Sequence, residues 1–246
     1  FGDEGAAALV RGKLQAPVVV VAVQGVEREP VDAMRQMLVA AEARLQGTVW
    51  FTNKLRLANP QDVEAVQTIL GVAMTRPDAL RRALAARLAE GWLPGSAPTI
   101  LPALRDAGFV DFEPPSGDPV DLAAIPPAGT FTLIISGADA EVANDELAGP
   151  FTSALTQRAP SIVLAAEPGR DASGDTPARR AVFLRPLRED EAVANRLATV
   201  DNLEDVRGRI ATVLALAGLA EGKIGHYGVG RGAQRLVPEV GPTEGG

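Results

Sequence analysis

The residues most able to take part in binding or catalysis lie close together near the end of the chain. The run KIGHYGVGRGAQ, residues 223 to 234, places four glycines around His226 and Tyr227, the only histidine and the only tyrosine in the sequence. Closely spaced glycines can present backbone N–H groups to an anion, and an imidazole can bind a metal or move a proton. The run could therefore be a phosphate loop, a metal site, a catalytic loop or only a turn.

A phosphate site is the weaker interpretation of these glycines. A dinucleotide fingerprint needs its glycines between the first strand and the following helix, whereas Gly228, Gly230 and Gly232 follow the last long helix. The turn after the first predicted strand, QGVEREP, has one glycine and carries acids where phosphates would lie. Because glycine readily adopts positive φ, we expect the run to form a turn.

The sequence offers few ligands for copper or zinc. It has one histidine, three methionines and no cysteine. Copper(I) favours thiolates and thioethers, and zinc usually takes several His or Cys ligands. Met34 and Met37 share the apolar face of a predicted helix, where methionines usually pack in the core. We therefore expect no internal metal site and no cofactor, while His226 could supply one ligand to a site shared across an oligomer.

Ser136, Asp201 and His226 form a candidate hydrolytic set. Ser136 ends a predicted strand, where a nucleophile could stand, with His226 as its base and Asp201 as the orienting acid. The surrounding IISGAD lacks the G-x-S-x-G pattern, however, and a serine at a strand end more often caps a helix or satisfies a turn. Hydrolysis or small-molecule binding at the carboxyl ends of the strands is thus the alternative hypothesis, and we assign no catalytic residue.

Composition argues against several other classes. The net charge is −7, from 31 acidic and 24 basic residues without a basic block, so we expect no nucleic-acid partner. The longest apolar run, residues 16 to 23, is far shorter than the roughly 20 residues of a membrane-spanning helix. The charged stretches EREP, residues 27 to 30, and REDE, residues 188 to 191, are predicted to be solvated faces.

The elements that must position these residues alternate between strand and helix. PVVVVAV, residues 17 to 23, is apolar without alternation, which is typical of a strand buried on both faces. Further strands are predicted at 47–53, 109–112, 130–137, 161–167, 181–186 and 196–202. Helices are predicted at 31–45, 61–74, 77–90, 101–107, 140–157 and 206–222, with 61–74 and 77–90 as a hairpin and with Asp139 and Glu141 as acids at a helix start.

This order predicts an α/β fold with a doubly wound, mostly parallel sheet, Rossmann-like or flavodoxin-like, and flanking helices. We interpret residues 1–237 as a single α/β domain. The loop-rich region from 93 to 129 reads as an elaborated crossover, and residues 238–246 as a flexible C-terminal tail.

The stretch from 199 to 233, TVDNLEDVRGRIATVLALAGLAEGKIGHYGVGRGA, resembles the C-terminal block of the actinobacterial copper transporter family. The shared pattern is T-V-D-[DN]-[ILV], then G-R-I-x-x-[VI]-L-A-L, then G-H-Y-G-x-G-x-G-A, and the rest of the chain agrees more loosely. Arg231 stands where the resemblance places His in a mycobacterial member, which removes a second potential ligand. The last pattern falls on Gly225, His226, Tyr227, Gly228, Gly230, Gly232 and Ala233.

The resemblance implies a cell-envelope protein with an N-terminal membrane helix, a coiled coil and this α/β domain on the extracytoplasmic side. Phe1 falls close to where the first two segments would end. The family is described as a copper-efflux channel of the outer membrane, and related proteins pair with a membrane partner and affect division and envelope integrity. We therefore expect a non-enzymatic homodimer with a membrane-associated protein partner, which meets the membrane only through its N-terminal segment. The glycine-rich run is its candidate interaction site.

Overall fold

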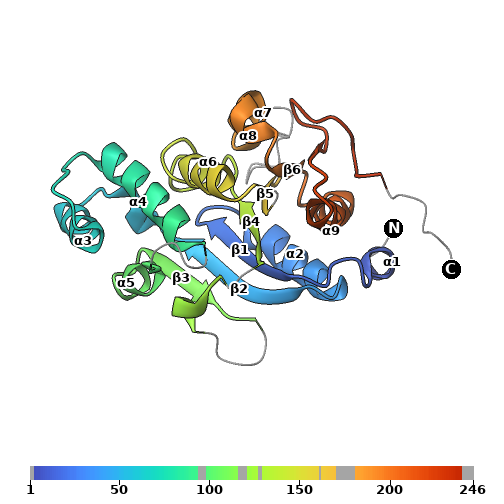
Figure 1. Ribbon diagram of the computed structural model, residues 1–246, viewed down its shortest axis with the longest axis horizontal. Helices are drawn as coiled ribbons and strands as arrows, with labels where there is room; N and C mark the ends of the chain where they lie inside the picture. Colours follow the sequence, from blue (N-terminus) through green and yellow to red (C-terminus); the bar gives the residue numbers. More distant parts are fainter. Residues whose placement is uncertain are drawn as a thin grey trace.

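A mostly parallel sheet forms the centre of the protein (Figure 1). The computed structural model describes residues 3–93, 98–115, 121–126, 129–160, 162–169 and 181–239. Within these ranges seven strands pair in the order β3-β2-β1-β4-β5-β6-β7, with only β3 antiparallel to its neighbour. The predicted α/β fold with a doubly wound sheet is confirmed. The strands are β1 Pro17–Val23, β2 Arg44–Phe51, β3 Val110–Glu113, β4 Phe131–Ile135, β5 Val163–Glu167, β6 Ala198–Asp201 and β7 His226–Tyr227.

Helices cover both faces of the sheet (Figure 1). One face packs against α1, α2 and α9, and the other packs against α4, α6 and α7. No helix within the described ranges is long and apolar enough to span a membrane. The helices are α1 Asp3–Val10, α2 Arg28–Ala40, α3 Pro60–Leu70, α4 Pro77–Gly91, α5 Leu101–Asp106, α6 Ala148–Arg158, α7 Leu184–Glu189, α8 Glu191–Ala194 and α9 Val206–Ala220, with short 3-10 turns η1 Asn53–Arg56 and η2 Leu122–Ala124.

The most apolar segments fold as the sequence predicts. β1 has the predicted bounds, and every residue in it is buried because successive side chains enter opposite cores. α4 begins at Pro77, where a missing N–H costs nothing, and it contacts α3 as a hairpin. Met34 and Met37 are both buried in the core, as expected.

The strand predicted at residues 181–186 is wrong. The chain turns there and enters α7, and the strand beside β5 is β6 instead. The Glu167 carboxylate at the end of β5 accepts hydrogen bonds from the backbone N–H groups of Phe183 (3.0 Å) and Leu184 (3.1 Å). Pro186, which lacks an N–H, fits the first turn of a helix. A carboxylate distant in sequence therefore decides the local structure.

The helix predicted at 140–157 begins later, at Ala148. Residues 137–147 form turns, held by Asn144, whose amide donates to the Gly137 carbonyl oxygen at 2.9 Å. Asp139 and Glu141 are therefore not at a helix start.

Smaller differences concern helix ends and the termini. α2 ends at Ala40 rather than 45, α3 ends at Leu70 rather than 74 before the left-handed Gly71, and the sequence reasoning missed α1. Most of the predicted tail, residues 240–246, lies outside the described residues, as do parts of the region from 93 to 129.

The crevice between the carboxyl ends of β1 and β4 is where a doubly wound sheet usually binds a nucleotide. Here the chain itself fills it. Gly25 has φ +101°, and a Cβ added to it would lie 2.1 Å from the backbone oxygen of Asp139. The Glu141 N–H donates to the Gln24 carbonyl oxygen at 2.7 Å. The remaining space beside Gly137 is about 10 Å³, so at most a water molecule fits.

Candidate functional site

The glycine-rich run lies at the edge of the sheet, in a segment that we call the motif loop, residues 225–235. His226 and Tyr227 form β7, which pairs in parallel with Thr199 and Val200 of β6. The chain then folds back, so that the Gly228 N–H donates to the Arg235 carbonyl oxygen at 2.8 Å. The predicted turn thus contains a short edge strand that sequence reasoning did not foresee.

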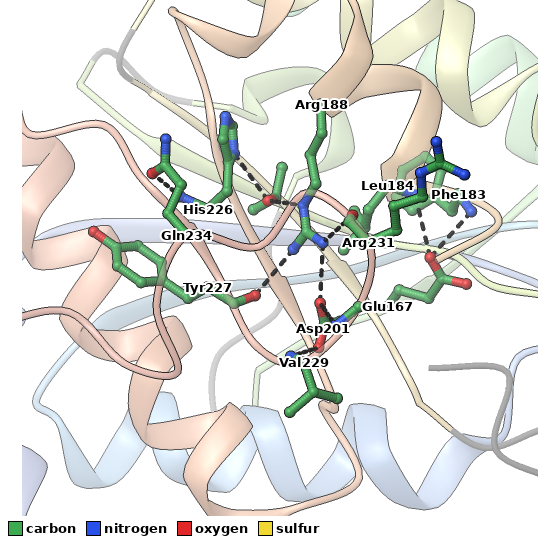
Figure 2. A network of polar contacts seen from close by, with 12 residues as sticks. Glu167, Phe183, Leu184, Arg188, Asp201, His226, Tyr227, Val229, Arg231 and Gln234 are labelled. Carbon is green, nitrogen blue, oxygen red and sulfur yellow. Dashed lines mark hydrogen bonds and ion pairs between the residues drawn. The ribbon is translucent and has the colours of Figure 1, made fainter. Parts of the chain in front are cut away.

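Arg188 on α7 is the centre of a buried polar network beside the motif loop (Figure 2). Its Nε donates to Thr199 Oγ1 at 2.7 Å, and one terminal nitrogen donates to Asp201 Oδ2 at 3.0 Å. The backbone oxygens of Tyr227 (2.9 Å) and Arg231 (3.1 Å) accept two further hydrogen bonds. Arg188 therefore ties α7, β6 and the motif loop together.

The predicted solvated face at REDE is wrong for Arg188. The side chains of Arg188 and Asp201 are each 1% exposed, whereas Glu189 and Asp190 in the same stretch are exposed. Burial lowers the pKa of Arg188 from its ordinary value, and Asp201 opposes that shift. A charged guanidinium that is removed from water needs hydrogen-bond acceptors, and four of them surround Arg188.

Asp201 occupies the anion-binding hollow that the glycines of the motif loop create. The backbone N–H groups of Val229 and Gly230 donate to its Oδ1 (2.6 Å) and Oδ2 (3.0 Å). Gly228 has φ +118°, and a Cβ added there would lie 2.0 Å from Asp201 Oδ1. The loop is the turn that the glycines predicted, and its N–H groups also cradle an anion, which is the protein's own carboxylate.

His226 is neutral and hydrogen-bonded inside the network. Its Nδ1 lies 3.0 Å from Thr199 Oγ1, and the residue is 6% exposed. The same Thr199 oxygen accepts a hydrogen bond from Arg188 Nε, so one hydroxyl group joins the guanidinium to the imidazole. Burial, and after it the positive charge of Arg188, lower the pKa of His226 to about 4, against the opposing effect of a hydrogen bond with the Ala194 backbone.

Glu167 connects this network to the start of α7. It ends β5 and lies in register with Asp201 on β6. Burial raises the pKa of Glu167 to about 7, the N–H groups at the start of α7 oppose the shift, and the charge of Asp201 adds to it. The same carboxylate that begins α7 thereby positions Arg188, which α7 carries.

The structure does not bring the candidate hydrolytic set together. Ser136 follows β4, Asp201 ends β6 and His226 begins β7, with β5 lying between β4 and β6. Ser136 Oγ donates to Asn144 Oδ1 at 2.5 Å, so it holds the turn after β4. His226 contacts Thr199 rather than Asp201, which is occupied by Arg188.

The remaining residues of the predicted site act through their backbones or stay on the surface. Arg231 contributes its carbonyl oxygen to Arg188, and its side chain is 65% exposed, 3.7 Å from Glu189. Within the described ranges no cluster of three or more His, Asp or Glu side chains is arranged to hold a metal ion.

Sequence reasoning missed Glu167, Arg188 and Thr199. One signal was available for Glu167, because a carboxylate that ends an apolar buried strand must find partners. Arg188 gave no such signal, because it stands in a charged run and its partners are distant in the sequence.

A comparison with known protein families shows which family this chain belongs to. The family model described as "Copper transport outer membrane protein, MctB" matches residues 1–238. The chain belongs to this MctB family. The resemblance carried by residues 199–233 is confirmed, and the Arg188–Asp201 network lies within the part of the MctB-family chain that the model matches.

Curated MctB-family relatives are known from mycobacteria. The proteins named "Copper transporter MctB" in Mycobacterium tuberculosis and Mycobacterium bovis are each 35% identical over 142 residues, which is 56% of this chain and 41% of the relative. The Mycobacterium leprae protein of the same name is 35% identical over 147 residues, 57% of this chain and 42% of the relative. The match thus spans less than half the length of these relatives.

Proposed function

We propose that this MctB-family chain is a non-enzymatic, extracytoplasmic domain of a membrane-anchored cell-envelope protein. It would act through dimerisation and protein partners in copper homeostasis and efflux or in envelope and division integrity. The supporting observation is that the polar groups of the family motif are engaged within the protein, by Arg188, Asp201 and Thr199.

The chemistry of the motif argues for a structural role of its polar groups. An active site needs a nucleophile, base or ligand that can reach the substrate. Asp201 is held by two N–H groups and a guanidinium, and neither it nor the buried His226 is free to react. The motif therefore anchors the edge of the sheet, and its function must lie in what that edge displays.

The outer side of the motif region displays apolar side chains. Val229 is 58% exposed and Leu236, just after the loop, is 43% exposed. Apolar side chains exposed near each other in the sequence could contribute to a contact with another protein chain. We propose this surface as a contact between two copies of the chain, in addition to any contact through a coiled coil upstream.

Sedimentation velocity of the chain tests this proposal. We expect a species of twice the chain's 25.6 kDa mass at micromolar concentration, and a monomer for the double variant Val229→Asp/Leu236→Asp. Leu9→Asp, at another exposed apolar residue, is the matched control and should remain dimeric. A wild-type chain that stays monomeric at every concentration would contradict the proposed contact.

A further inference from the structure

A second surface lies away from the motif loop, at the carboxyl end of β4. It is a pocket of about 710 Å³ between the turns of residues 137–145, the first residues of α6, and α7. This volume falls within the range of about 300–1,000 Å³ that is usual for ligand sites. In doubly wound sheets this edge is also where ligands bind, and the crevice beside it is filled by the chain itself.

The floor of the pocket is apolar. Phe183 and Leu187 are buried beneath it, and Pro150 and Pro186 form parts of its wall. Ala143 and other alanines line the mouth, where small side chains leave space for an occupant. An apolar group entering the pocket would gain contacts with rigid rings and with the Leu187 side chain.

The rim of the pocket is acidic. Glu141, Asp145 and Asp190 line it, and within the described ranges none of these three carboxylates forms an ion pair. Arg56 is the one cation among the described lining residues, and its Nε donates to the Glu141 backbone oxygen at 2.5 Å. Among the described lining residues, three carboxylates against one guanidinium leave an excess of two negative charges, and the N-terminus of α6 offsets only about half a charge.

We infer that this pocket binds a short basic segment of a protein partner. A Lys or Arg of that segment would pair with Asp145 and Asp190, and a neighbouring apolar side chain would pack on Phe183 and Leu187. These two aspartates are exposed at the rim rather than buried in the floor, which suits a side chain that stays attached to a chain outside. The inference rests on the proposed protein-binding role, but it concerns a different surface from the motif loop.

The test uses ¹⁵N-labelled protein and two blocked hexapeptides, one with Arg flanked by Leu residues and one with Glu in place of Arg. We expect the Arg peptide to shift the amide resonances of Ala138, Asn144 and Leu187, and the Glu peptide to leave them unchanged. Added salt should weaken the binding, because the charges at the rim are exposed. Shifts centred elsewhere, equal binding of both peptides, or no shift would each overturn the inference.

Two variants make the site assignment falsifiable. Asp145→Asn/Asp190→Asn should reduce affinity for the Arg peptide about fivefold to tenfold, or about 1–1.4 kcal/mol in total for two exposed ion pairs. The asparagine that replaces Asp190 would still cap α8, as the aspartate does through the Ala192 N–H. Ala143→Trp should block the pocket and abolish binding. Asp205→Asn, at the N-cap of α9, and Ala124→Trp, on exposed η2, are matched controls that should bind normally.

Other occupants have distinct signatures in the same experiment. Binding of free arginine amide as tightly as the Arg peptide would overturn the peptide assignment and indicate a small-molecule site. Peptide binding that survives Ala143→Trp would overturn the pocket itself. Val229→Asp/Leu236→Asp should leave peptide binding unchanged, so failure of the proposed dimer contact and failure of this inference are read separately.

Discussion

The network at β5–β7 and the pocket at β4 lie along the same edge of the sheet, at the carboxyl ends of parallel strands, but they use charge in opposite ways. In the network, Arg188 and Asp201 are 1% exposed and each is paired on several sides. At the pocket, Asp145 and Asp190 are exposed, and no ion pair to either is seen in the described part of the chain. Residue types alone do not separate the two regions. Burial and pairing do, and they assign the first to stability and the second to binding.

The largest expected effect comes from breaking the buried pair. Arg188→Met keeps much of the length of the side chain but leaves the Asp201 carboxylate buried without its cation. Loss of one member of a buried ion pair typically costs about 3–5 kcal/mol of unfolding free energy, which urea denaturation would measure. Arg185→Met on the same helix removes an exposed pair with Glu189 and should cost less than about 1 kcal/mol. Equal losses of unfolding free energy in Arg188→Met and Arg185→Met would show that the buried ion pair contributes no more than the exposed one.

The stability of the network should depend on pH through two groups, Glu167 and His226. The folded pKa of Glu167 is raised to about 7, so its contribution to stability is present at low pH and is lost as pH rises from 4.5 to 7. The folded pKa of His226 is lowered to about 4, so its contribution has the opposite sign and grows as pH rises from 4 to 6.5. The two contributions should largely cancel in the wild type.

Glu167→Gln removes the contribution of Glu167 to the pH dependence of stability and leaves that of His226. Relative to the wild type, the unfolding free energy of the variant should rise by about 3 kcal/mol between pH 4.5 and 7, measured by urea denaturation at each pH. A flat difference between Glu167→Gln and wild type would mean that the folded protein holds Glu167 at its ordinary pKa.

Gly228→Ala tests whether the motif loop is shaped around Asp201. Both Gly228 and Gly222 have positive φ, but a Cβ at Gly228 would meet the Asp201 carboxylate, whereas nothing lies within 4 Å of one at Gly222. Gly222→Ala should therefore lose only the stability that is due to backbone strain. Gly228→Ala should cost about 2 kcal/mol more in thermal or urea unfolding, because the carboxylate must leave its hydrogen bonds. Similar costs for the two variants would argue against the cradle.

Strong local signals in the sequence predicted the fold well. The apolar run of β1 gave its correct bounds and Pro77 gave the correct start of α4, because burial on both faces and a missing N–H act locally. The segment 181–186 failed because four apolar residues suit a strand or a helix equally, and Glu167, far away in sequence, decided between them. A local pattern cannot contain such a partner.

The sequence drew attention to the motif loop but did not reveal its chemistry. Its glycines predicted a turn rather than an anion site, and the single imidazole drew attention to His226. Which anion fills the cradle depends on β6 lying beside β7, and the lowered pKa of His226 depends on its burial in the assembled fold and on the nearby charge of Arg188. These relations arise only when the sheet is assembled.

Copper(I) binding distinguishes a structural role of His226 from a role as metal ligand in this copper-transport family chain. A competition titration against a chromophoric copper(I) chelator, under reducing conditions, would compare the wild type with His226→Ala. We predict that the wild-type chain removes no copper from the chelator and that His226→Ala behaves identically. Copper transfer to the wild type that His226→Ala abolishes would show that His226 is a metal ligand and not a structural residue.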